Sequence, residues 1–292
     1  MRILLFGASG QVGTEFLSLA ASEDVEVVAP GEGTLDLTDA DAVAAVIAEG
    51  SWSAVVNAAA YTDVDRAEGQ EAIALAVNGK APAQLAIETR CLGIPLIHIS
   101  TDYVFDGRKG TPYVEGDVPA PLNAYGRSKL AGEHGVVAGN PRHVILRTSW
   151  VYSPYGRNFV LTILRLAKER ERLTIVADQR GCPTAARDVA QACLTVALRC
   201  GADPARGPYG LYHFAGAGEA TWFEFATAIV RLAQLPRPVE VLPIRSCEYP
   251  TAAIRPADTR LDCAAVARDF GFELRPWQDA LEETLGRLLE RP

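Results

Sequence analysis

The sequence has little positive charge. Among its 292 residues, 28 are Lys or Arg and 36 are Asp or Glu, which gives a formal net charge of −8. No run of basic residues offers a surface that could follow the phosphates of a nucleic acid. We therefore expect no nucleic-acid partner.

Long hydrophobic runs are also missing. Nowhere do 18 consecutive apolar residues occur, so no segment has the length of a membrane-spanning helix. The first apolar run, Ile3–Phe6, is followed at once by glycine and is too short for the core of a signal peptide. These features predict a cytoplasmic protein without a membrane partner.

The cysteines and histidines do not have the spacing of a metal site. The six cysteines contain no C-x-x-C pair, and the four histidines lie far apart in the chain. Zinc sites bring such residues together in short, regular spacings. We therefore expect free thiols in a reducing compartment and no metal ligands among these residues.

Short aliphatic runs alternate with helical patterns in the first part of the chain. The expected strands are Arg2–Phe6, Val25–Val28, Ala54–Val56 and Leu96–Ile99, and the expected helices between them are Glu15–Ala21, Asp39–Ala48 and Ala72–Arg90. This order is typical of a parallel sheet wrapped by helices, and continuously apolar strands indicate that both faces are covered. The sequence predicts a Rossmann-like, doubly wound α/β fold.

The later part of the chain has a different composition. It contains an expected strand, Val144–Leu146, and expected helices Phe159–Glu171 and Asp188–Arg199. Prolines then become frequent between Gly201 and Pro256, where Trp222–Leu232 is the one clear helix. We expect residues 1–150 to form the dinucleotide-binding domain. Residues 151–292 are expected to form mainly a smaller α/β substrate-binding region, with some segments returning to the first domain.

A glycine-rich turn follows the first expected strand. Gly7, Gly10 and Gly13 have the spacing G-x-x-G-x-x-G, which departs from the commoner G-x-G-x-x-G. In such turns, glycines allow a tight bend, a close approach of the backbone to a pyrophosphate and close packing of helix on sheet. The turn lies between a strand and a helix, as a dinucleotide site requires.

The end of the second expected strand does not decide between NADH and NADPH. An acidic residue at that position accepts a hydrogen bond from the ribose of NAD, whereas arginine favours the extra phosphate of NADP. This chain has Ala29-Pro30-Gly31 there, with Glu32 and Asp36 as later acidic candidates. The cofactor preference stays open.

Tyr125 and Lys129 lie four positions apart, so they share one face if "YGRSKLAGE" is helical. A nearby ammonium lowers the pKa of a tyrosine, which is otherwise about 10. Alone, the pair could be an ordinary surface pair. Two other features favour catalysis, since Ser100-Thr101 and Asn57-Ala-Ala-Ala60 come directly after expected strands, at the sheet edge where such folds bind ligands.

Together these motifs resemble the extended short-chain dehydrogenase/reductase superfamily. More narrowly, "STDYVFDG", "PLNAYGRSKLAGE", "DQRGCPT" and "IRPADTRLD" resemble segments of the dTDP-4-dehydrorhamnose reductase family. The resemblance runs from residue 2 to about residue 280.

The resemblance implies an activity. That family reduces the 4-keto group of dTDP-4-dehydro-β-L-rhamnose with NADPH or NADH and forms dTDP-L-rhamnose. Its catalytic residues fall on Thr101, Tyr125 and Lys129, with Tyr125 as the proton donor and Lys129 also holding the nicotinamide ribose. Ser100 is the alternative to Thr101 as the third catalytic group.

The resemblance also implies the binding residues. Cofactor contacts are expected at Gly7, Gly10, Gln11, Val12, Gly13, Asp36, Leu37, Ala60, Tyr61, Thr62, Tyr125 and Lys129. Contacts with the nucleotide-sugar substrate are expected at Thr101, Asp102, Trp150 and Arg255, with Val64 and Tyr103 as walls. Arg255 could hold the diphosphate or could form an ordinary ion pair.

One departure from the family concerns metal. Some members form dimers around Mg²⁺ held by acidic side chains, and Glu15 matches the first of these positions, but the second is Arg187. A hard cation requires oxygen ligands, so Mg²⁺ is doubtful here and the chain is expected to be a monomer or a homodimer.

Two other functions are compatible with the same motifs. A nucleotide-sugar epimerase or dehydratase also uses Tyr-x-x-x-Lys but keeps its cofactor through the cycle. A regulatory subunit of methionine adenosyltransferase resembles the family and binds NADP without turnover. The complete Thr101, Tyr125 and Lys129 set favours the reductase.

Overall fold

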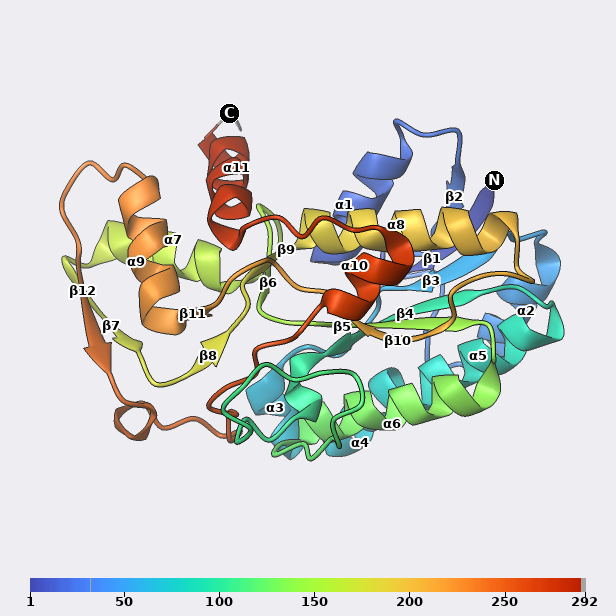
Figure 1. The fold of residues 1–292 in the computed structure, drawn as a ribbon, viewed down its shortest axis with the longest axis horizontal. Helices are drawn as coiled ribbons and strands as arrows, with labels where there is room; N and C mark the ends of the chain where they lie inside the picture. Colours follow the sequence, from blue (N-terminus) through green and yellow to red (C-terminus); the bar gives the residue numbers. More distant parts are fainter. Residues whose placement is uncertain (32, 290–292) are drawn as a thin grey trace.

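The protein is built around a six-stranded parallel sheet, shown in Figure 1. The computed structural model describes residues 1–31 and 33–289. The strand order is β2-β1-β3-β4-β5-β10, made by β1 (Arg2–Phe6), β2 (Glu26–Val28), β3 (Ala54–Asn57), β4 (Leu96–Thr101), β5 (His143–Thr148) and β10 (Gly210–His213). From β1 the chain adds β2 on one side of the sheet and then β3, β4 and β5 on the other. Open parallel sheets bind ligands at the point between β1 and β3 where the strand order reverses.

Helices cover both faces of the sheet. On one face, α1 (Gln11–Ala20) packs against α8 (Ala186–Ala202); on the other lie α2 (Ala40–Glu49), α5 (Ala81–Cys91) and α6 (Ala124–Gly139) (Figure 1). Successive strand residues serve opposite cores, since Ile3 and Leu5 pack on the α1 side and Leu4 and Phe6 on the α2 side. The predicted doubly wound α/β fold is confirmed.

The expected helix Ala72–Arg90 is interrupted. It consists of α4 (Glu71–Leu75), a π-helical turn (Ala76–Lys80) and α5, and a short helix α3 (Val64–Gly69) precedes it. The turn contains the buried Asn78, whose amide bonds the backbone N–H and C=O of Tyr61 at 2.8 and 2.9 Å. Such π turns are frequent beside functional sites. Here the turn holds the loop after β3 in place.

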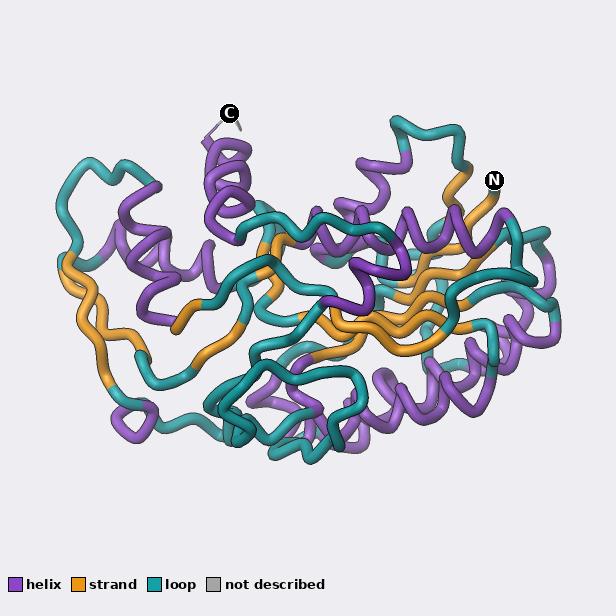
Figure 2. Tube along the Cα trace, in the orientation of Figure 1, coloured by secondary structure: helices purple, strands orange, loops and turns teal. Residues whose placement is uncertain are grey.

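A second hydrophobic core lies beside the sheet, on the left in Figures 1 and 2. Tyr152, Phe225 and Trp277 are buried in it. Its helices are α7 (Phe159–Glu169), α9 (Trp222–Leu232) and α11 (Trp277–Leu289). Its strand pairs are β7 (Arg172–Val176) with β12 (Glu240–Ile244), β6 (Val151–Tyr152) with β9 (Thr184–Ala185), and β8 (Arg180–Gly181) with β11 (Ala220–Thr221).

The chain leaves the central sheet after β5 and later returns to it. Helix α8 packs on α1, β10 pairs with β5 in parallel, and α10 (Ala264–Phe270) contacts β10. The proposed boundary at residue 150 therefore marks the first departure from the sheet. Among residues 1–31 and 33–289, no helix is both long enough and apolar enough to span a membrane.

Candidate active site

A cavity of about 820 Å³ lies between the sheet and the second core. It opens at the carboxyl ends of the strands, where Gly7 follows β1, Ala58 follows β3 and Thr101 ends β4. On the side of the second core, the cavity is lined by Trp150, Arg157 and Trp222. Its volume lies within the range of about 300–1,000 Å³ that is typical of small-molecule sites.

The predicted phosphate loop lies at this cavity. Gly7 has φ +84°, and a Cβ there would come within 2.4 Å of the backbone nitrogen of Ala59. A Cβ on Gly13 would come within 2.1 Å of the carbonyl oxygen of Gly7. Helix α1 begins without a side-chain cap at Gly10, so the N–H groups of its first turn can bind an anion. The loop therefore fits the pyrophosphate of a dinucleotide.

The far end of the cavity is lined by residues that follow β2. They are Pro30, Leu35, Asp36 and Leu37. Asp36 Oδ1 accepts hydrogen bonds from the backbone N–H and the hydroxyl of Thr38, both at 2.8 Å, and these bonds lower the pKa of the exposed carboxyl. The other acidic candidate, Glu32, lies outside the described residues.

Helix α6 brings Tyr125 and Lys129 to the cavity, as the sequence predicts. The helix begins there because the side chain of Asn123 accepts a hydrogen bond from the backbone N–H of Gly126 at 2.8 Å. Lys129 Nζ donates to the carbonyl oxygen of Ile99 in β4 at 2.6 Å. The α6 face that carries both residues is therefore fixed against the end of β4.

The two candidates for the third catalytic group have different neighbours in the structure. The Thr101 side chain lies near enough to Tyr125 to lower the pKa of the tyrosine, and its hydroxyl donates to Asp102 Oδ1 at 3.1 Å. Ser100 also lines the cavity, but its hydroxyl donates to Glu133 Oε1 at 2.5 Å. Both oxygens of Glu133 also accept from Arg147, at 2.9 and 2.6 Å. Ser100 thus belongs to a buried ionic cluster, whereas the Thr101 hydroxyl bonds Asp102 beside the tyrosine.

The pKa values of Tyr125 and Lys129 differ from the expectation that the lysine lowers the pKa of the tyrosine. Burial raises the pKa of Tyr125 to about 12, the Thr101 side chain opposes this rise, and the nearby Asp102 adds to it. Lys129 is not among the causes that shift the pKa of Tyr125; burial lowers the pKa of Lys129 itself to about 8. Desolvation is the largest cause of the pKa shift for both residues. Tyr125 is therefore protonated at neutral pH, as a proton donor must be.

Asp102 and Trp150 also line the cavity. Burial raises the pKa of Asp102 to about 6, although its carboxylate accepts hydrogen bonds from Thr101, Ser149 and Thr259 at 3.1, 3.0 and 2.5 Å. Trp150 has φ +48°, and its ring stacks on that of Trp222 with centroids 3.4 Å apart. Trp222 is a lining residue that the sequence reading missed, because it had only the pattern of an ordinary helix residue.

Three of the predicted site residues do not line the cavity: Gly13, Tyr61 and Arg255. Gly13 packs α1 against the loop. The Tyr61 hydroxyl donates to Gln70 Oε1 at 3.1 Å. Arg255 makes paired hydrogen bonds to both carboxylate oxygens of Asp65, at 3.0 and 2.7 Å. The ion-pair alternative thus accounts for Arg255 in this structure, and its contact with substrate stays a prediction.

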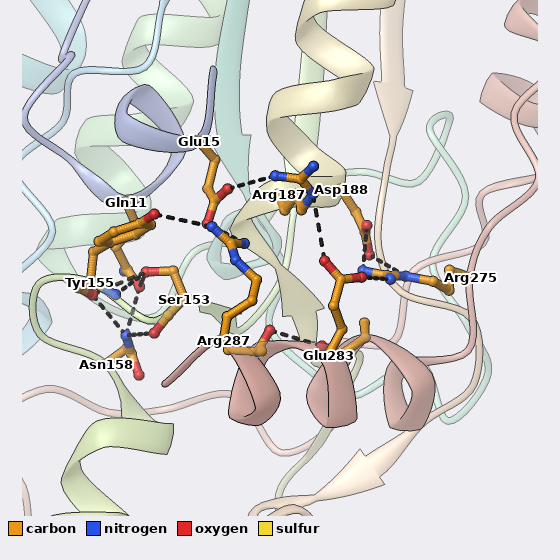
Figure 3. A network of polar contacts seen from close by, with 12 residues as sticks. Gln11, Glu15, Ser153, Tyr155, Asn158, Arg187, Asp188, Arg275, Glu283 and Arg287 are labelled. Carbon is orange, nitrogen blue, oxygen red and sulfur yellow. Dashed lines mark hydrogen bonds and ion pairs between the residues drawn. The ribbon is translucent and has the colours of Figure 1, made fainter. Parts of the chain in front are cut away.

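The residues around Glu15 do not fit a magnesium site (Figure 3). Glu15 is fully buried, and its two oxygens accept from Arg187 Nη1 at 3.3 Å and from Arg287 Nη1 at 2.8 Å. Arg187 also forms an ion pair with Glu283. Guanidinium groups thus occupy the positions around this carboxylate that oxygen ligands of a hard cation would need. The doubt about Mg²⁺ stays a prediction, and this geometry supports it.

The chain is similar to proteins of known activity along its whole length. The model of the family described as RmlD substrate binding domain matches residues 1–290. The dTDP-4-dehydrorhamnose reductase of Sinorhizobium fredii is 43% identical over 291 residues, which cover 99% of this chain and 98% of that protein.

Solved structures are similar over the same length. A dTDP-4-dehydrorhamnose reductase from Clostridium acetobutylicum has a TM-score of 0.93 and 36% identity, with 99% of this chain and 100% of that chain covered. One from Bacillus anthracis, solved in complex with NADP, has a TM-score of 0.91 and 35% identity, with coverage of 98% and 99%.

Proposed function

We propose, from the premise that this chain belongs to the dTDP-4-dehydrorhamnose reductase family, that it reduces the 4-keto group of dTDP-4-dehydro-β-L-rhamnose to dTDP-L-rhamnose. The reductant is NADPH or NADH. One observation carries the proposal: a full-length match to reductases accompanies a cavity in which Tyr125 and Lys129 both lie beside a phosphate loop. The epimerase or dehydratase and the regulatory-subunit alternatives have no comparable support.

We assign the proton transfer to Tyr125. A bound dihydronicotinamide would supply the hydride to the keto carbon. The Tyr125 hydroxyl donates its proton to the carbonyl oxygen, so that an alkoxide charge does not build up without a partner. Thr101, whose side chain lies near Tyr125 and lowers its pKa, would orient that hydroxyl. We assign this role to Thr101 over Ser100 because Thr101 affects the pKa of Tyr125, whereas the Ser100 hydroxyl donates to Glu133 within the buried cluster with Arg147.

Lys129 has two proposed tasks. Its ammonium would hold the hydroxyls of the nicotinamide ribose, and its charge would stabilise the anion that Tyr125 becomes after proton transfer. The residue is buried, and the carboxylate of Glu133 on the next turn of α6 opposes the loss of its proton. Lys129 must be charged for both tasks, which makes its ionisation a determinant of activity.

The remaining binding residues divide between the two ligands. The loop at Gly7, Gly10, Gln11 and Val12 would hold the dinucleotide, with Asp36-Leu37 at its adenosine end and Ala60 and Thr62 along its ribose path. The buried Thr148 hydroxyl, which lines the cavity without a protein partner among the described residues, is free to bond a ligand.

For the sugar we propose Asp102 and Trp150, and for the diphosphate Arg255, which would have to exchange its contact with Asp65. We further propose that the enzyme acts in the cytoplasm, as a monomer or homodimer, without nucleic-acid or membrane partners.

The proposed activity is tested by nicotinamide absorbance. Purified protein is mixed with NADPH or NADH and dTDP-4-keto-6-deoxyglucose, with and without a 3,5-epimerase that converts this sugar to the 4-keto-rhamnose form. Consumption of cofactor only in the presence of the epimerase is the expected result. Cofactor binding without any consumption would instead favour the regulatory-subunit alternative.

The pH dependence of kcat/KM should report Lys129. Burial lowers its pKa to about 8, so the ammonium is present below that pH and is lost as the pH rises through it. We expect kcat/KM to fall above about pH 8, while Tyr125, with a pKa of about 12, stays protonated. In Lys129→Arg, the guanidinium does not lose its proton, so the residual activity should not fall in this range. A decline at the same pH in both proteins would exclude Lys129 as its cause.

A further inference from the structure

The adenosine end of the cavity is made by a part of the chain that has no cations. Between Arg2 and Arg66 the sequence contains neither Lys nor Arg. This stretch includes β1, the phosphate loop, α1, β2 and the segment after β2 that lines the cavity with Pro30, Leu35, Asp36 and Leu37. Arg2 itself lies at the start of β1, at the opposite edge of the sheet, and bonds Glu26 at 2.9 Å.

The segment after β2 is where dinucleotide folds distinguish their cofactors. NADPH differs from NADH by a phosphate on the adenosine ribose, and proteins bind that group with arginine or lysine. In this chain the only charged side chain among the described residues that line this end is the carboxylate of Asp36. Its bonds with Thr38 favour the ionised form. A phosphate there would face a negative charge and, among the lining residues that the structure describes at this end, no positive one.

The two cationic side chains among the described lining residues lie elsewhere. Lys129 is buried against β4, where it bonds Ile99. Arg157 belongs to the loop between β6 and α7, and this loop is fixed to the first residue of α1, since Ser153 Oγ and Asn158 Nδ2 both donate to Gln11 Oε1 at 2.8 Å (Figure 3). Arg157 is therefore positioned near the pyrophosphate end of the site.

We infer that the cofactor site of this enzyme favours NADH over NADPH, because the segment after β2 contains no Lys or Arg and places the Asp36 carboxylate where the ribose phosphate would lie. The inference rests on the proposed function, whose cofactor it specifies. A related reductase was solved in complex with NADP. We therefore attribute the preference for NADH to residues of this chain and not to the family as a whole.

The first test is direct binding. The dissociation constants of NADH and NADPH are measured with the purified full chain by calorimetry, without substrate. We expect NADH to bind at least about tenfold more tightly, since a bond to a charged group contributes about 1.5–3 kcal/mol where a partner exists. Equal affinities, or tighter binding of NADPH, would overturn the inference while leaving the reductase activity possible. Binding of neither cofactor would overturn the proposed function as well.

A gain-of-function variant tests the cause. Pro30→Arg adds a guanidinium at the cavity wall and should reduce the ratio of the two dissociation constants at least about tenfold. Ser18→Arg adds the same charge on the exposed face of α1, away from the cavity, and should leave the ratio unchanged. An unchanged ratio in Pro30→Arg, or an equal change in both variants, would contradict a local cause.

Arg157→Ala separates the two possible roles of that side chain. If Arg157 acts at the pyrophosphate, which both cofactors share, the variant weakens NADH and NADPH by the same factor. A loss confined to NADPH would show that Arg157 reaches the ribose phosphate, and would overturn the inference.

Discussion

Replacing Tyr125 with phenylalanine is expected to reduce turnover by about 10²–10⁴-fold, the usual effect of a positioned acid, and to leave dinucleotide affinity nearly unchanged. The variant removes one hydroxyl from a buried side chain at the cavity and leaves the ring in place. The pKa of Tyr125 in the wild-type protein is about 12, so its hydroxyl carries a proton throughout the working pH range. Turnover is measured by nicotinamide absorbance and affinity by calorimetry.

Tyr61→Phe is the matched control. It removes the same group from a tyrosine that the family resemblance also placed at the cofactor, but the Tyr61 hydroxyl bonds Gln70 and Tyr61 does not line the cavity. We expect turnover within a few-fold of wild type. Unaltered turnover in Tyr125→Phe, or an equal loss in Tyr61→Phe, would assign the proton transfer to another group.

Replacing Arg147 with methionine is expected to lower the free energy of unfolding by about 3–5 kcal/mol, because it leaves a buried carboxylate without its partner. Arg147 and Glu133 have side-chain exposures of only 3% and 2%. In the variant, Glu133 would retain the hydroxyl of Ser100 but no guanidinium. Denaturant unfolding followed by circular dichroism measures the change.

An exposed pair supplies the comparison. Arg165 and Glu169 on α7 are 61% and 52% exposed, and Arg165→Met should cost less than about 1 kcal/mol. If both variants lost equally little stability, the buried cluster of Ser100, Glu133 and Arg147 would not be a stabilising element of the fold.

The first part of the fold was predictable because the inner strands of the sheet, β1, β3, β4 and β5, are covered on both faces. Residues such as Ile3 and Leu4 point to opposite cores, so both must be apolar and the strand appears as an unbroken hydrophobic run. Strand β10 was not predictable, since its short segment, Gly210–His213, becomes a strand only by pairing with β5, more than sixty positions earlier. Its identity depends on tertiary contacts.

The features of the candidate site also fall into two groups: those that a local sequence pattern predicts, and those that depend on contacts between distant segments. The glycine loop and the Tyr125–Lys129 spacing are local patterns, and local patterns can be read from sequence. The stacking of Trp222 on Trp150 and the pairing of Arg255 with Asp65 join distant segments. The raised pKa of Tyr125 was not predicted either. Burial is its main cause, and the burial of a side chain depends on the tertiary structure, which the spacing of residues in the sequence does not give.

The return of the chain to the sheet limits how this protein can be taken apart. Helix α8 and strand β10 come from the middle of the second half of the chain, yet they cover α1 and complete the sheet beside β5. A fragment that ended at residue 150 would lose both, leaving β5 as an unpaired edge and one sheet face stripped of a covering helix. The cofactor-binding half is thus not a detachable module, and exchanging its substrate region with that of a relative would require several junctions instead of one.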